Sequence, residues 1–140
     1  MLRTAHGGAN RDRGDLDRRA IATQKQPMRR VEKPWGYELI FAHTDRYVGK
    51  LLHIEPGHVL SLQYHNKKDE SIYVLSGEII LRLQQGEQLT ERRVRAGEAF
   101  HIPPKLIHQF EAVTVTDLLE ASTPELDDVV RLKDRYGRVQ

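Results

Sequence analysis

The chain has 140 residues, 39% of them hydrophobic, and a formal net charge of +2, which suits one domain with a single core and leaves little room for a second. Because it contains no cysteine, disulfides, thiolate metal sites and cysteine nucleophiles are excluded. No apolar run is long enough for a membrane-spanning helix or resembles a signal peptide, so we expect a cytoplasmic protein with no membrane partner.

The first 28 residues contain few large apolar side chains. Positions 1–30 hold eight basic and three acidic residues, which leaves 14 basic and 17 acidic residues in the remainder. We therefore expect a disordered basic tail over residues 1–28, with a helical turn near residues 15–21. The basic excess is confined to this tail, which could contact RNA or an anionic surface. A solvated tail without such a function is the preferred interpretation, so we expect no nucleic-acid partner.

A folded domain is expected over residues 29–140, because large apolar residues become frequent from Val31 onwards. The segment "VEKPWGYELIF" brings large apolar residues together, and we expect Trp35, Tyr37 and Phe41 in the core or at a dimer interface. Eight short β-type runs follow, separated by Gly, Pro and Asn turns: 47–54, 58–65, 71–77, 78–84, 92–97, 98–103, 106–113 and 116–122. Many short strands at this spacing predict an all-β sandwich or barrel.

The end of the chain has a different pattern. Ser122 or Thr123 could cap a helix that has Pro124 at its first position. We expect residues 122–140 to be helical in part.

A group of polar residues interrupts the apolar runs in "SLQYHNKKDESIYVLSGE", residues 61–78. Residues two apart in a strand share a face, so Gln63 and His65 should point the same way. Glu70 follows a four-residue polar loop, and if the two strands pair as a hairpin it lies near His65. An amide oxygen, an imidazole and a carboxylate are competent ligands for a divalent first-row metal.

A fourth ligand is expected from the segment "GEAFHIPPKLIHQFE", in which His108 follows a Pro-Pro turn. The competing interpretation is a polar core that satisfies its own hydrogen bonds. For the remaining histidines that interpretation is preferred, although His101 could lie near the site. We predict one divalent metal bound by Gln63, His65, Glu70 and His108.

The spacing of these residues resembles the two motifs of the cupins. The first motif has Gly, five residues, His-x-His, a short gap, Glu, six residues and Gly. Here Gly57, Gln63-Tyr64-His65, Glu70 and Gly77 stand at those positions. The second motif is matched by Gly97, Pro103 and His108, but Lys105 replaces its glycine and Ala112 its asparagine. The resemblance implies a double-stranded β-helix, the cupin jelly-roll barrel, with a metal at one open end.

In the first motif, Gln63 stands in place of the first histidine. In this respect the sequence resembles the cupin domain of type II phosphomannose isomerases, which is the C-terminal domain of the bifunctional isomerase–guanylyltransferases. The segments "KPWGYELIF" and "DDVVRLKDRYGR" also resemble that family. The resemblance implies a metal-dependent aldose–ketose isomerase acting on a phosphorylated sugar, a mannose-6-phosphate isomerase-like enzyme of carbohydrate metabolism. Cupins commonly dimerise, so a homodimer is expected.

The resemblance also suggests roles for three basic residues. Lys50 aligns with a lysine of the family's barrel, where it would serve in acid–base chemistry or phosphate binding if it faces inward. Arg138 or Arg131 could bind the phosphate, because a guanidinium group matches its geometry.

The metal and the function each leave alternatives open. An amide oxygen makes the site harder, which favours Zn²⁺ or Mn²⁺, with Fe²⁺ or Ni²⁺ possible. A non-catalytic metal- or ligand-binding cupin and a metal-dependent cupin oxygenase are the other two candidate functions.

Overall fold

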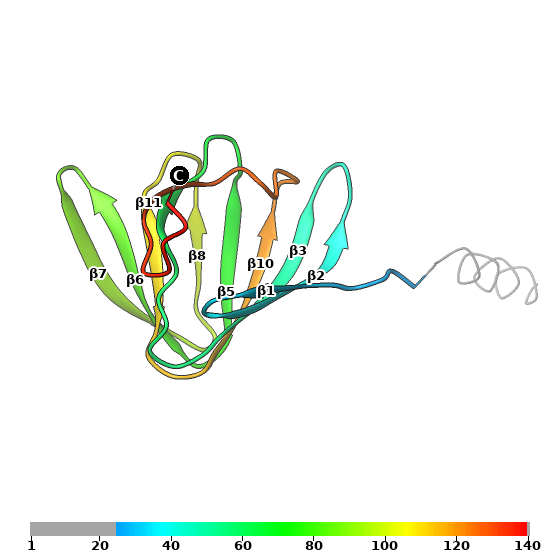
Figure 1. Ribbon diagram of the computed structural model, residues 1–140, viewed down its shortest axis with the longest axis horizontal. Coiled ribbons are helices and arrows are strands. Elements are labelled where there is room, and N and C mark those ends of the chain that lie inside the picture. The colour runs from blue at the N-terminus through cyan, green and yellow to red at the C-terminus, as the bar shows by residue number, and fades with distance from the viewer. Residues whose placement is uncertain (1–24, 140) are drawn as a thin grey trace, which may run out of the picture.

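The computed structural model describes residues 25–139, and this part of the chain forms eleven strands in two facing antiparallel sheets (Figure 1). The strands are β1 (Arg29–Lys33), β2 (Gly36–His43), β3 (Val48–Ile54), β4 (Leu62–Tyr64), β5 (Glu70–Ser76), β6 (Glu78–Gln85), β7 (Gln88–Arg95), β8 (Ala99–Ile102), β9 (His108–Ala112), β10 (Thr116–Ser122) and β11 (Val130–Lys133). The expectation of an all-β jelly-roll barrel is confirmed.

Strands far apart in the sequence are neighbours in both sheets. One sheet has the order β1-β2-β3-β10-β5-β8 and the other β11-β4-β9-β6-β7. Thus β10 lies between β3 and β5, and β9 between β4 and β6. Such non-local pairing brings the two halves of the domain together in both sheets.

Alternating side chains build the core between the two sheets. In β5, Ile72 and Val74 are buried while Ser71 and Tyr73 are exposed. Ile79 and Leu81 of β6 face them from the other sheet and are fully buried in the same apolar cluster. At about 25 cal/mol per Å² of buried apolar surface, this layer supplies the main driving force for folding, so the barrel does not depend on a metal for its core.

Gly77 shows why the first motif ends on a glycine. Its φ is +88°, a left-handed conformation that residues with a Cβ rarely adopt. A Cβ there would lie 2.3 Å from the carbonyl oxygen of Val115 and 2.5 Å from Oγ1 of Thr116. Both the backbone conformation and the close approach of the neighbouring strand therefore require glycine between β5 and β6.

Three sequence-based expectations are wrong. β4 and β5 do not form a hairpin, because they belong to different sheets. The segment after Ser122 forms turns and β11 rather than a helix. The eight expected strands omit β1, β2 and β11, of which the first two form the edge of the larger sheet.

The expected N-terminal tail and the question of a membrane-spanning helix remain to be compared with the structure. The expected tail, residues 1–28, lies mostly outside the described residues, which begin at Lys25. The first strand, β1, begins at Arg29. Among residues 25–139 there is no helix with the length and apolar character needed to cross a membrane.

Candidate metal centre

Three buried side chains meet at one end of the barrel. Nε2 of His65 lies 3.4 Å and Nε2 of His108 lies 3.5 Å from the same oxygen, Oε1 of Glu70. All three side chains are at most 4% exposed, and their potential ligand atoms lie within 4.8 Å of one another. His65 follows β4, Glu70 opens β5 and His108 opens β9, so both sheets contribute to the cluster.

Each imidazole is oriented by a hydrogen bond on its far nitrogen. Nδ1 of His65 lies 2.6 Å from the carbonyl oxygen of Asp128, and Nδ1 of His108 lies 2.8 Å from that of Leu106. A carbonyl can only accept, so both Nδ1 atoms carry the proton. In the neutral rings Nε2 then presents a lone pair to the cluster, which is the tautomer that a metal requires.

The charge state of Glu70 also suits a cation site. Burial alone would raise its pKa, but hydrogen bonds that His108 and His65 donate from Nε2 when their rings carry both protons, together with the ammonium of Lys68, outweigh burial and hold the pKa of Glu70 well below its usual range. The carboxyl group is therefore ionised at neutral pH, which is the form that coordinates a metal.

The donor set fits a divalent metal ion. Nε2 of both histidines is buried without a hydrogen-bond partner among the described residues, a costly arrangement for polar atoms. Two ligands about 2.1 Å from a tetrahedrally coordinated metal lie about 3.4 Å apart, which matches the distances to Oε1 of Glu70. The cluster of His65, Glu70 and His108 can thus hold a metal ion with little rearrangement.

Gln63 lies next to this cluster. It is directly opposite His108 in the pairing of β4 with β9, so the two side chains share a face, and Gln63 lines the cavity. Its Oε1 accepts a hydrogen bond of 2.6 Å from Oγ of Ser61. The position agrees with the predicted fourth ligand, while its coordination stays a prediction.

Lys50 points into the barrel rather than to solvent. It is 6% exposed and lines the same cavity. Nζ lies 3.3 Å from Oε1 of Glu38 and 3.6 Å from Oε2 of Glu120. The inward orientation is the one in which the resemblance assigns Lys50 a chemical role.

Sequence reasoning missed two charged residues of this interior, Lys68 and Glu120. Lys68 lies in the polar loop before β5, where an exposed side chain is expected. It is nevertheless only 4% exposed, and its Nζ contacts Oε2 of Glu70 at 3.0 Å and Oε2 of Glu120 at 3.2 Å. The alternation of β10 could have revealed Glu120, since it shares the inward face with Leu118. Burial and then the nearby carboxylate of Glu70 raise the pKa of Glu120.

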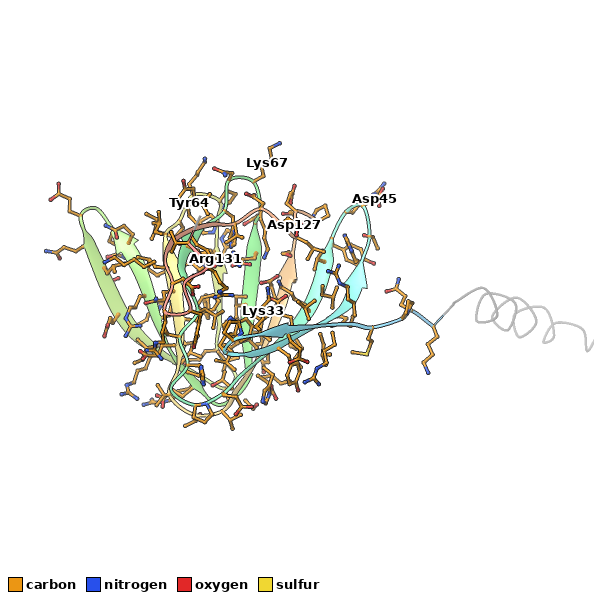
Figure 2. The ribbon with its side chains drawn as sticks, viewed as in Figure 1. Lys33, Asp45, Tyr64, Lys67, Asp127 and Arg131 are labelled. Atoms are coloured by element: carbon orange, nitrogen blue, oxygen red, sulfur yellow. The ribbon has the colours of Figure 1, made fainter. Side chains whose placement is uncertain are left out.

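Basic side chains also line the cavity; Lys33 and Arg131 are labelled in Figure 2. Lys33 from β1, Arg131 from β11 and Arg138 near the C-terminus all line it, as does the acidic Asp127. Nε of Arg131 is buried without a hydrogen-bond partner among residues 25–139. Burial, only partly offset by Glu38, lowers the pKa of Lys33, and Lys50, Arg131 and Arg138 contribute to that lowering.

Arg138 differs from Arg131 because a carboxylate already binds it. Its Nε and Nη2 donate to Oδ2 and Oδ1 of Asp134 at 2.8 and 2.9 Å. The segment around it is fixed by a 2.6 Å hydrogen bond between Tyr136 and His58. Of the two arginines, Arg131 is therefore better placed to bind an additional anion.

The loop between β4 and β5 is held by Asp128. Its carboxylate accepts hydrogen bonds from the backbone N–H groups of Asn66, Lys67 and Lys68 at 2.6–3.0 Å. Although burial opposes ionisation, these donors lower the pKa of Asp128 to about 2. One residue thus fixes the loop through its side chain and orients His65 through its backbone.

Two residues singled out by the sequence lie outside the cavity. His101 is exposed and its Nε2 contacts Oδ1 of Asp69. Lys105, at the position of the missing motif glycine, has a φ of +72° and donates from its backbone N–H to the carbonyl oxygen of His65 at 2.7 Å. Lys105 therefore preserves the glycine-like turn of the second motif.

Comparison with known families agrees with this geometry. A family model described as a cupin domain matches residues 50–120, about half of the chain. The chain is 37% identical over 117 residues to a mannose-1-phosphate guanylyltransferase of Escherichia coli K12, covering 79% of this chain and 23% of that protein. It is 30% identical over 118 residues to the xanthan biosynthesis protein XanB of Xanthomonas campestris pv. campestris, covering 79% and 24%. The chain thus spans about a quarter of the length of these relatives.

Solved structures share the fold at lower identity. KdgF from Halomonas sp. superposes with a TM-score of 0.60 at 23% identity, covering 73% of this chain and 91% of that one. Oxalate decarboxylase from Bacillus subtilis gives a TM-score of 0.66 at 14% identity, covering 81% and 32%. At these identities the likeness concerns the barrel alone.

Proposed function

Because the chain belongs to the cupin family, we propose that it is a metal-dependent aldose–ketose isomerase of a sugar phosphate, similar to a mannose-6-phosphate isomerase. The observation that carries the proposal is the joint presence of a buried two-histidine, one-carboxylate cluster and several basic side chains in the lining of one cavity. The names of several relatives, which refer to mannose 1-phosphate, support a phosphorylated sugar as the ligand.

The metal would be held by His65, Glu70 and His108, with Gln63 as the fourth ligand, at one ion per chain. Zn²⁺ or Mn²⁺ suits a set of two imidazoles and two oxygens. A bound divalent ion supplies Lewis-acid polarisation of a sugar oxygen without a change of redox state, which is the chemistry that an isomerase needs.

Lys50 is the proposed proton-transfer residue. An aldose–ketose isomerisation moves one proton between C1 and C2 and another between their oxygens, so the composition of the sugar is unchanged. The ammonium of Lys50 can donate to a sugar oxygen, and its partner Glu38 also lines the cavity and can accept a proton. Both groups are held by packing, which is what a positioned acid and base require.

Arg131 is the proposed phosphate ligand, with Lys33 beside it and Arg138 as the alternative. Arg131 is paired with Gln63, and Gln63 with His108, across three adjacent strands. Two strand spacings separate the Cα atoms of Arg131 and His108 by roughly 10 Å. A hexose phosphate whose C1 and C2 oxygens face the metal ligands carries its phosphate at the far end, on the side of Arg131.

The expected homodimer has a candidate surface on the outside of the larger sheet. Leu39, Leu51, Leu119 and Tyr73 stand in register across β2, β3, β10 and β5. Phe41 is 45% exposed beside this row, and its ring lies over Gly49, where a Cβ would be 2.7 Å from it. Such a row would be covered by the same surface of a second copy. Sedimentation of Tyr73→Asp beside wild type tests it, and an unchanged mass would contradict it.

The isomerase activity is tested with protein loaded with Mn²⁺ or Zn²⁺. The substrates are mannose 6-phosphate and glucose 6-phosphate, and the appearance of fructose 6-phosphate is the readout. Turnover should depend on the metal and should be lost in Lys50→Met. If the loaded protein binds these sugar phosphates but converts none of them, a non-catalytic binding cupin takes the place of the isomerase.

A further inference from the structure

Four buried charged side chains and a fifth that is partly buried, Glu38, form a line of alternating sign that ends at the candidate metal centre. From the metal side they are Glu70, Lys68, Glu120, Lys50 and Glu38. The successive N–O distances are 3.0, 3.2, 3.6 and 3.3 Å. No side chain in the line is more than 14% exposed, and the residues come from β5, the preceding loop, β10, β3 and β2.

Stability does not explain this arrangement. Removing two ammonium groups and three carboxylates from water costs several kcal/mol per ion, and their mutual attraction often fails to offset that cost relative to apolar side chains. The adjoining layer of the same barrel is filled by Ile72, Val74 and Leu118, each at most 1% exposed. Apolar side chains could therefore fill this part of the barrel as well. The charged residues are thus better explained by a role at the candidate metal centre.

Glu70 is divided between two sets of partners. Oε1 faces the two imidazoles, while Oε2 faces the ammonium of Lys68. A carboxylate can bind a metal through one oxygen or through both. The same ammonium also contacts Oε2 of Glu120 at 3.2 Å, so one side chain engages the carboxylates of both Glu70 and Glu120.

We propose that Lys68 is a positioning residue of the metal centre, which restricts Glu70 to coordination through Oε1 and keeps Glu120 out of the ligand set. The inference rests on the metal site of the proposed function. Because Lys68 is an ammonium it cannot itself coordinate, and it competes with the metal for the outer oxygen of Glu70 only. The result is a metal that keeps a coordination position for an exchangeable ligand, as catalytic sites do.

The test uses Co²⁺-loaded protein, whose visible absorption reports coordination number, together with the metal stoichiometry. Lys68→Met removes the charge and retains an unbranched stem. It should still bind about one Co²⁺ per chain, with a weaker visible absorption, because Glu70 becomes bidentate or Glu120 joins the ligands. Lys68→Arg should restore the wild-type spectrum. The matched control is Lys67→Met, since Lys67 is exposed and its side chain points away from the barrel (Figure 2).

Two further variants keep the test decisive if Lys68→Met folds poorly. Glu120→Gln leaves the Lys68–Glu70 pair intact and should show the wild-type spectrum. The double variant Lys68→Met with Glu120→Gln neutralises one charge of each sign and should fold, yet its spectrum should change because Glu70 is released. A wild-type spectrum in Lys68→Met or in the double variant overturns the inference, as does loss of cobalt from the folded double variant. Wild-type protein that binds cobalt but isomerises no sugar phosphate contradicts only the proposed function.

Discussion

His65 and Glu70 are five residues apart in the sequence, yet the strands that they follow and open belong to different sheets, and Nε2 of His65 lies 3.4 Å from Oε1 of Glu70. A metal bound there would cross-link the two sheets. It would bind only to the folded barrel, since the unfolded chain does not hold these ligands together. Ligand binding of this kind shifts the unfolding equilibrium by mass action.

Metal binding should therefore raise the stability of wild-type protein. At a free metal concentration one hundred times Kd the free energy of unfolding should rise by about 2.7 kcal/mol. The double variant His65→Ala with His108→Ala should bind no metal and show no such increase, while remaining folded around its apolar core. Elemental analysis and urea unfolding with and without chelator measure both effects. Full metal retention by the double variant would show that the ligands lie elsewhere.

Asp128 should matter for both the loop and the metal. Asp128→Ala removes the acceptor of three backbone N–H groups, and the loss of hydrogen bonds to a charged group costs about 1–3 kcal/mol. The affinity for metal should fall as well, about 10-fold or more, because the loop that carries Glu70 and the carbonyl that orients His65 are both released. Asp127→Ala, one residue away and exposed, is the control and should retain both properties.

The structure places His65, Glu70 and His108 together. The sequence could indicate this because the motif spacings limit how far apart these residues can lie along the chain. It could not predict which strands pair, since alternation assigns a residue to a face but not a strand to a sheet. Hence Glu70 was expected beside His65 by a hairpin, while in the structure it approaches from the opposite sheet. The same limit concealed Lys68, whose burial depends on partners as distant as Glu120.

The C-terminal segment illustrates the competition between local and long-range preferences. Pro124 and its preceding residues carry the signals of a helix start, but those signals are worth about 1 kcal/mol each. Pairing of Val130–Lys133 with β4 offers backbone hydrogen bonds and an additional interface with the barrel. Long-range pairing therefore prevails, and it places Arg131 opposite Gln63.

Lys105→Gly should make the protein more stable. A residue with a Cβ in the left-handed region costs roughly 1 kcal/mol relative to glycine, and Lys105 has a φ of +72°. Loss of the hydrogen bond from Nζ to Asn66 should offset only part of this gain, because both residues are exposed. Urea denaturation should show an increase of about 0.5 kcal/mol. Lys105→Ala, which loses the same hydrogen bond without gaining conformational freedom, should not be stabilised.

His53 should give the protein a pH-dependent contribution to stability. Burial alone would lower its pKa, but contacts of Nδ1 with Asp117 at 2.6 Å and of Nε2 with Glu55 at 3.1 Å raise it above 6.5. The folded state therefore binds this proton more tightly than the unfolded chain. The contribution is complete below about pH 6.5 and is lost as the pH rises through the raised pKa.

The size of this contribution should be at most about 1 kcal/mol, because its partners are partly exposed and screened. Unfolding of wild type and His53→Gln is to be compared from pH 5 to pH 9. The two stability curves should converge towards the alkaline end. A constant difference across that range would show that the charge of His53 does not contribute.

The basic residues that line the cavity lead to a prediction about substrate recognition. Under the proposed isomerase function, Arg131→Ala should lower kcat/KM for a hexose 6-phosphate by one to two orders of magnitude, since a charge-assisted contact is worth roughly 1.5–3 kcal/mol. Lys33→Gln should act in the same direction with a smaller effect, because a single ammonium lacks the bidentate fork. Lys133→Gln, which removes an exposed charge from the same strand, is the matched control.

Arg138→Ala distinguishes a direct contact from an indirect one. If the guanidinium that Asp134 binds also touches the phosphate, its removal should weaken sugar phosphates but not the metal. If it only shapes the C-terminal segment, the loss should be partial and Arg138→Lys should restore little, since lysine cannot reproduce the bidentate pair. Binding of fructose 6-phosphate and of fructose, measured by calorimetry on metal-loaded protein, separates the phosphate contribution from the rest. Equal ratios of the two affinities in wild type, Arg131→Ala and Arg138→Ala would eliminate both arginines as phosphate ligands.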